Sequence, residues 1–147
     1  MPAVKTLLVG FLAALVAGLW NQLLLGRRVR DVPAALGPFV EEALKTGLAL
    51  ITGTSLPGVH ITFGLVEGLW ELGRRPMAAG PERSNLTRWG PALAALGGHT
   101  FFGWLAFQAY NRTGQPGLAW AVGFLAHLAW NRGVISLHCR AWHRYKT

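Results

Sequence analysis

The residues best suited to chemistry lie in one apolar run, Pro38 to Lys45, where Glu41 and Glu42 stand about one helical turn before Lys45. A carboxylate can accept a proton from water, and a nearby lysine keeps a second carboxylate ionised. Neighbours on a helix diverge by about 100°, so one glutamate can face a reaction centre while the other pairs with Lys45. Charged groups at membrane depth cost roughly 3 kcal/mol each, which makes this run a functional hypothesis.

Later apolar segments carry four more polar residues that could join such a site: Glu67, His99, His127 and Asn131. Together with the run at Glu41 they supply a general base, groups that tune it, and donors for a developing oxyanion. The structural alternative is that a histidine or asparagine at membrane depth only holds two helices together. That alternative is less satisfactory for Glu41, Glu42 and Glu67, because burying a carboxylate at membrane depth costs free energy.

The composition indicates a membrane protein of single-domain size. The chain has 147 residues, of which 52% are hydrophobic and only six are acidic. Its net charge of +8 comes from arginines clustered between apolar runs, without a stripe of exposed aromatics, so we do not expect a nucleic-acid partner. The single Cys139 excludes an intrachain disulfide and a metal cluster built from cysteines.

Five apolar segments predict an all-α, polytopic membrane helix bundle around a polar intramembrane cavity, forming one integral-membrane domain over residues 1–147. A cleaved signal peptide is the alternative for the first segment, but its apolar stretch is too long and a basic cluster follows it. We interpret His60 and His138 as structural, because both lie near predicted helix ends. The predicted helices are 4–25, 34–52, 59–72, 89–110 and 117–137.

Basic residues are concentrated in alternate loops. They are concentrated after the first and third segments and in the tail, which predicts a cell-membrane protein with its N-terminus outside and its C-terminus in the cytoplasm. The polar residues then lie about 10 to 15 Å from the cytoplasmic ends of their helices, at 1.5 Å per residue. A shared depth favours one buried site over scattered structural hydrogen bonds. The residues at this depth are Glu41, Glu67, His99, His127 and Asn131.

Four segments resemble, in order, the motifs of the PrsW family of glutamic intramembrane proteases, within the CAAX protease superfamily. Pro38 to Lys45 resembles its E-E-x-x-K motif, and Phe63 to Glu67 its F-x-x-x-E motif. His99 is similar to the third, histidine motif, and His127 to Asn131 resembles the H-x-x-x-D/N motif. The type II CAAX prenyl proteases have histidine at the position of Glu67, which favours the PrsW family.

The resemblance implies a peptidase buried in the lipid bilayer that cleaves membrane proteins or membrane peptides without a cofactor or metal. In this interpretation Glu41 activates water, Glu42 and Glu67 tune its charge, and Lys45 neutralises part of the acidic cluster. His99 assists proton transfer. His127 and Asn131 stabilise the oxyanion.

Three alternatives remain open. The superfamily includes the gamma-secretase scaffold subunit, so a non-catalytic scaffold is one, and a small ion-coupled carrier using the same acids is another. A zinc-dependent protease is the third, although the H-E-x-x-H helix of many zinc proteases is absent. PrsW-like proteins generally have more spanning helices, so this chain resembles a reduced core, for which homo-oligomerisation and loss of activity are both open.

Overall fold

The computed structural model describes residues 1–25, 33–73 and 85–144, and these residues form five α-helices and no strand. The all-helical class predicted from the sequence is confirmed. The arginine clusters at 26–32 and 74–84, on which the predicted topology depends, lie outside the described residues. The helices are α1 (Pro2–Leu25), α2 (Pro33–Thr52), α3 (Leu56–Gly73), α4 (Asn85–Thr113) and α5 (Pro116–Arg144).

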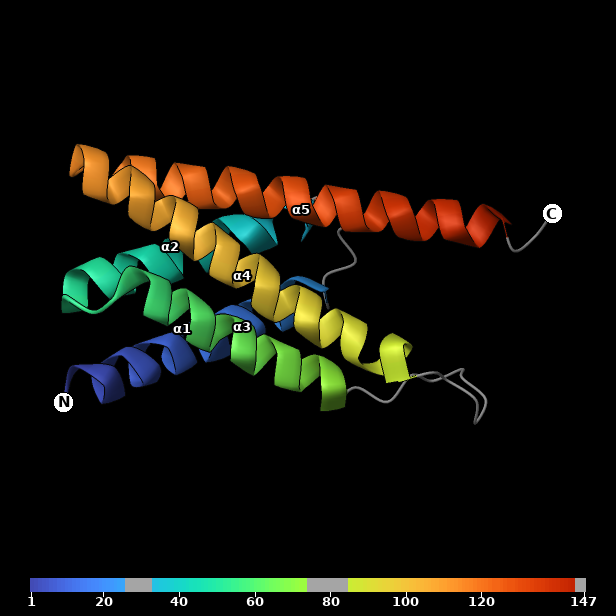
Figure 1. Ribbon diagram of the computed structural model, residues 1–147, viewed down its shortest axis with the longest axis horizontal. Helices are drawn as coiled ribbons and strands as arrows, with labels where there is room; N and C mark the ends of the chain where they lie inside the picture. The colour runs from blue at the N-terminus through green and yellow to red at the C-terminus, as the bar shows by residue number, and fades with distance from the viewer. Residues whose placement is uncertain (26–32, 74–84, 145–147) are drawn as a thin grey trace.

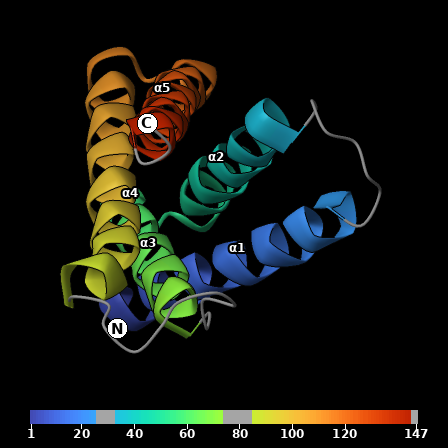
Figure 2. The same ribbon diagram turned by 90° about the vertical axis from the view of Figure 1, so that its right-hand side faces the viewer.

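The five helices form a closed ring. Going round it, α1 packs on α3, α3 on α4, α4 on α5, α5 on α2, and α2 on α1 again (Figures 1 and 2). The most extensive of these interfaces joins α3 and α4, and α2 also touches α3 across the ring. Because α2 contacts α1, α3 and α5, side chains on different faces of α2 reach different parts of the interior.

Local signals explain where the helices end. Gly53 follows α2 with a φ of 62°, and the Thr54 amide donates to the Ala49 carbonyl at 2.9 Å, which together form the common glycine cap. Helix α3 begins at Leu56, three residues before the predicted start, because the Ser55 hydroxyl accepts from the Gly58 amide at 3.2 Å. Helices α4 and α5 are also longer than the predicted segments 89–110 and 117–137. Polar residues at their ends, which the prediction left out, belong to the helices.

Glycines bring α3 and α4 into close contact. A Cβ on Gly68 would lie 2.9 Å from the Ala92 carbonyl oxygen, and one on Gly64 would lie 3.1 Å from the Leu96 Cα. Two glycines four residues apart let helix backbones approach closely, as in membrane helix pairs. The same approach sets the position of His99, whose Cβ is 3.0 Å from the Cβ that Gly64 lacks.

Helix α1 buries its small residues and exposes its large ones. Ala13 and Ala17 are fully buried, whereas Leu19 and Leu23 are 63% and 65% exposed. Among the described residues, one helical stretch, Pro2–Leu23, is long and apolar enough to cross a membrane. The outward face of α1 is a continuous apolar surface that includes Val4, Leu8, Phe11, Leu12, Leu15, Val16 and Trp20.

The contact between α3 and α4 at Gly103 can be tested by adding one methyl group. A Cβ on Gly103 would collide with the Cβ and ring of the buried His60. We expect Gly103→Ala to lower the free energy of unfolding by about 1–3 kcal/mol, the usual cost of overpacking. Gly97→Ala in the same helix is the control, because nothing lies within 4 Å of its added Cβ. Equal stability of the two variants in detergent would contradict this packing.

Candidate active site

The polar cluster begins with a fully buried ion pair on α2. Lys45 Nζ lies 2.5 Å from Glu42 Oε1, and both side chains are completely shielded from solvent. The same ammonium group donates to His99 Nδ1 at 2.9 Å and lies 4.3 Å from the centre of the Phe63 ring. The lysine therefore has a carboxylate, an imidazole and an aromatic face around it, which is what a buried ammonium requires.

These contacts determine which nitrogen of each histidine carries the proton. His99 Nδ1 accepts from Lys45, so its proton is on Nε2, which donates to the Glu67 carboxylate. The two bonds fix the ring of His99 as a neutral tautomer. In His127 the proton is on Nδ1 instead. Its Nδ1 donates to Glu42 Oε1 at 3.0 Å, which leaves Nε2 as an acceptor.

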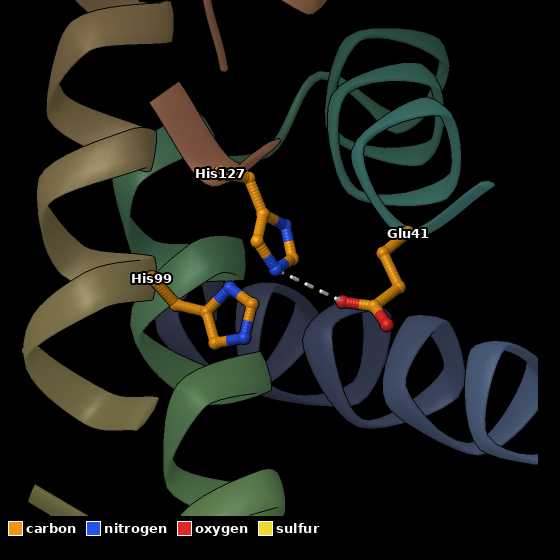
Figure 3. A group of neighbouring side chains, drawn as sticks. All are labelled: Glu41, His99 and His127. Atoms are coloured by element: carbon orange, nitrogen blue, oxygen red, sulfur yellow. Dashed lines mark ion pairs between the residues drawn. The ribbon is translucent and has the colours of Figure 1, made fainter. Parts of the chain in front are cut away.

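Glu41 has one oxygen without a partner. Its Oε1 accepts from Asn21 Nδ2 of α1 at 2.9 Å, but its Oε2 makes no hydrogen bond to any described residue although the side chain is nine-tenths buried. This Oε2 lies 3.9 Å from His127 Nε2 (Figure 3). Two acceptors that face each other at this distance need a shared donor, and a water molecule can supply both hydrogens.

A cavity of about 180 Å³ lies beside Glu41, between α1, α2 and α3. Such a volume holds several water molecules, since one water needs on the order of 15 Å³ measured in this way. Small residues of α1, including Ala14, Ala17 and Gly18, form one wall, and Glu67 of α3 lies on another. Glu41 is one of the residues that line this cavity, although its Oε2 itself is fully buried.

The structure brings six of the seven predicted site residues into one network, in which every link is a hydrogen bond except the 3.9 Å approach of Glu41 to His127. Asn131 is the exception: it lies one turn beyond His127 on α5, is half-buried, and its side chain makes no hydrogen bond to another described residue. Its amide is thus not committed to packing within the described chain. The six connected residues, in order along the network, are Glu41, His127, Glu42, Lys45, His99 and Glu67.

Two members of the cluster were not recognised from the sequence. Asn21 holds Glu41, and an amide inside the apolar first segment was the only signal for it. His60 was interpreted as structural near a helix end, but it is completely buried, and its Nδ1 lies 3.8 Å from Glu42 Oε2. Neither of its ring nitrogens makes a hydrogen bond to a described residue. Its spacing of four and seven from Gly64 and Glu67 already placed it on the active face of α3.

Comparison with known proteins supplies no relative. No known protein family, curated protein or solved structure matches this chain.

A metal ion is one occupant that the donor atoms could accept. One atom each from Glu41, His99 and His127 lie within 4.8 Å of one another, and all three residues are buried. Glutamate and histidine are good zinc ligands. However, both ring nitrogens of His99 already have partners, Lys45 and Glu67, so a metal would have to displace one of them. The network as it stands has Lys45 as its cation.

The buried ion pair between Lys45 and Glu42 can be tested through the stability of the protein. Lys45→Met leaves the Glu42 carboxylate buried without its cation, and we expect a loss of about 3–5 kcal/mol in the free energy of unfolding. The double variant Lys45→Met/Glu42→Gln removes both charges and should recover at least half of that loss. Unfolding in detergent, followed by heat or by denaturant, measures both. A double variant no more stable than the single one would show that the pair is not held by charge.

Proposed function

We propose that this protein is a membrane-embedded peptidase of the PrsW type, in which a glutamate activates water. The observation that carries the proposal is the Oε2 of Glu41, which has no hydrogen-bond partner among the described residues and faces His127 Nε2 across 3.9 Å (Figure 3). Glu41 also lines the cavity of about 180 Å³. A general base needs a free lone pair within reach of the proton it removes. The four sequence motifs that resemble the PrsW family contribute six residues of this one network.

In the proposed reaction, a water molecule between Glu41 and His127 donates one hydrogen to Oε2 and the other to Nε2. As the water oxygen bonds to the peptide carbonyl carbon, Glu41 takes its proton and the carbonyl oxygen becomes an oxyanion. The proton then passes from Glu41 to the amide nitrogen as the C–N bond breaks, so the carboxylate is restored. Both acid and base steps are thus assigned to one carboxyl group.

The hydrogen bonds change the role expected for His127. Its Nδ1 proton is committed to Glu42, so the ring orients water as an acceptor instead of donating to the oxyanion. The oxyanion donor in our proposal is Asn131, because its amide has no hydrogen-bond partner among the described residues and follows His127 by one turn. The neighbouring groups act through electrostatics: Lys45 balances Glu42, and Glu67 holds the neutral tautomer of His99.

Exposed apolar side chains support placing the whole bundle in a membrane. Large apolar residues are exposed on every helix of the described chain, not only on α1, whereas Glu41, Glu42 and Lys45 are buried inside the ring. A water-soluble protein would show the reverse. We therefore propose that all five helices span the bilayer, with the N-terminus outside and the C-terminus in the cytoplasm. Examples beyond α1 are Ile51 at 84%, Leu69 at 67%, Leu93 at 59% and Leu125 at 61% exposure.

A proton-coupled carrier is the second candidate, because the same network consists of titratable groups that follow one another through the bundle. Buried relays of carboxylates and histidines are typical of pumps and transporters. The two functions differ in what the protein does to a peptide: a carrier moves ions across a liposome membrane and leaves peptide bonds intact. Flux driven by a pH gradient, without cleavage, would favour the carrier.

The peptidase is tested by comparing the parent protein with Glu41→Gln, purified in lipid nanodiscs, on membrane-spanning peptides. We expect Glu41→Gln to lose at least 100-fold in turnover, the low end of general-base catalysis. Its stability should change little, because a glutamine oxygen can still accept from Asn21. Strong chelators should leave the parent active. Unchanged turnover in Glu41→Gln would remove the mechanism, and loss on chelation with recovery on added zinc would favour the metal alternative.

The proposed topology predicts the labelling of three single cysteines in a Cys139→Ser background. Ser55→Cys and Gln115→Cys lie at the two turns at one end of the ring, and Gly73→Cys lies at the other end of α3. In intact cells, a membrane-impermeant maleimide should label the first two and should reach Gly73→Cys only after permeabilisation. Equal labelling of all three before permeabilisation would contradict the five-span arrangement.

A further inference from the structure

We infer that the end segment of α1, residues 18–23, is a gate over the proposed base Glu41, and that Asn21 is the latch that holds this gate shut. The gate rests on the proposed function, because it is the way by which a membrane-spanning substrate reaches that site. The site is closed as it stands. Glu41 is nine-tenths buried and its Oε2 is fully buried, so a peptide does not reach this oxygen until a neighbouring element moves.

The two ends of α1 are attached differently. Near its beginning, Lys5 Nζ donates to the Thr52 carbonyl at 2.5 Å. Further along, a Cβ on Gly10 would lie only 2.5 Å from the Cβ of Thr62 on α3. In the end segment, a Cβ on Gly18 would have nothing within 4 Å, and no residue is buried. The first half of α1 is therefore fixed against its neighbours, whereas the end segment can move with little loss of packing.

Asn21 joins the end segment to the proposed base. It is half-buried, whereas the other residues of the segment are exposed. Its Nδ2 donates to Glu41 Oε1 at 2.9 Å, and this is the one side-chain hydrogen bond from the segment to another helix of the described chain. Moving the segment outward therefore breaks this bond and uncovers Glu41 in the same step.

The cavity beside Glu41 shows where the gate opens. Gly18, Asn21 and Gln22 of the end segment line it on the α1 side, and Trp70 lines it on the α3 side. The C-terminal end of α1 lies away from α3 and α4 (Figure 2). Outward movement of the segment would therefore join the cavity to the surrounding lipid between α1 and α3. A membrane-spanning peptide then enters sideways, without exposing its apolar side chains to water.

The test locks the gate with a disulfide in a Cys139→Ser background. Asn21→Cys/Gly37→Cys joins the end segment to α2, because Asn21 Oδ1 lies 3.4 Å from the position of a Cβ on Gly37. Thr6→Cys/Gly58→Cys joins the fixed half of α1 to α3 and is the matched control, since a Cβ on Gly58 would lie 2.6 Å from Thr6 Cγ2. The reduced form of each pair is its reference.

Access to Glu41 is measured with dicyclohexylcarbodiimide, an apolar reagent that enters from the lipid and adds to carboxyl groups, and mass spectrometry locates the modified residue. We expect the Asn21→Cys/Gly37→Cys disulfide to slow both modification of Glu41 and cleavage of a spanning peptide by about tenfold or more, and reduction to restore both. The control disulfide should change either rate by less than about twofold. A locked protein that is modified and cleaves as fast as its reduced form would overturn the gate.

The latch is tested separately by Asn21→Leu, which keeps the approximate size of the side chain and removes its hydrogen bond to Glu41. Gln22→Leu is the control, because Gln22 lines the same cavity but its side chain makes no hydrogen bond to a described residue. Asn21→Leu should raise the rate of Glu41 modification about three- to tenfold, the effect of losing one hydrogen bond between helices, and Gln22→Leu by less than about twofold. Equal rates in the two variants would show that Asn21 is not the latch.

The gate and the peptidase fail in different ways. Slower modification of Glu41 in the locked protein, without cleavage of any peptide by the parent protein, would remove the peptidase and keep the gate. Cleavage that depends on Glu41 and proceeds equally in the locked and reduced proteins would keep the peptidase and remove the gate.

Discussion

The structure depends on one buried ion pair, Glu42 with Lys45. Two charges removed from solvent are tolerated only when each is paired and hydrogen-bonded, and here the pair supplies those bonds to its neighbours. The ammonium fixes the tautomer of His99, and the carboxylate fixes that of His127. Because the proton of His127 is on Nδ1, its Nε2 is left as an acceptor that faces Oε2 of Glu41. The ion pair therefore sets the protonation pattern of the whole cluster.

Two adjacent glutamates acquire different roles because they face different neighbours. Glu42 points into the ring toward Lys45 and His127, where its charge is balanced and it is closed off from solvent. Glu41 lies between α1 and α5, where Asn21 donates to one oxygen and the other oxygen faces His127. Glu42 is therefore part of the buried framework, whereas Glu41 keeps one oxygen without a hydrogen bond to a described residue.

The ring of helices lets this polar cluster exist within an apolar exterior. Small residues lie where helices meet, as at Gly64 and Gly68 of α3, so that backbones approach closely and large side chains are left for the outside. His60 fits beneath α4 because Gly103 has no side chain. A cavity lies where α1 borders α2 and α3. In the peptidase interpretation, this cavity is where substrate enters.

The sequence by itself determined the all-helical class and the five helices of the described chain, and it placed Glu41 and Glu42 both within reach of Lys45, because each depends on spacing along one helix. The structure decided that Glu42 is the partner. The sequence also identified six residues of the network, since charged and imidazole side chains are conspicuous in apolar segments. Only the tertiary structure decided the contact of Asn21 with Glu41 and the burial of His60 against Glu42. These contacts join helices far apart in sequence, and they depend on how each helix is rotated about its axis and how closely its neighbour approaches, which residue spacing within one helix does not specify.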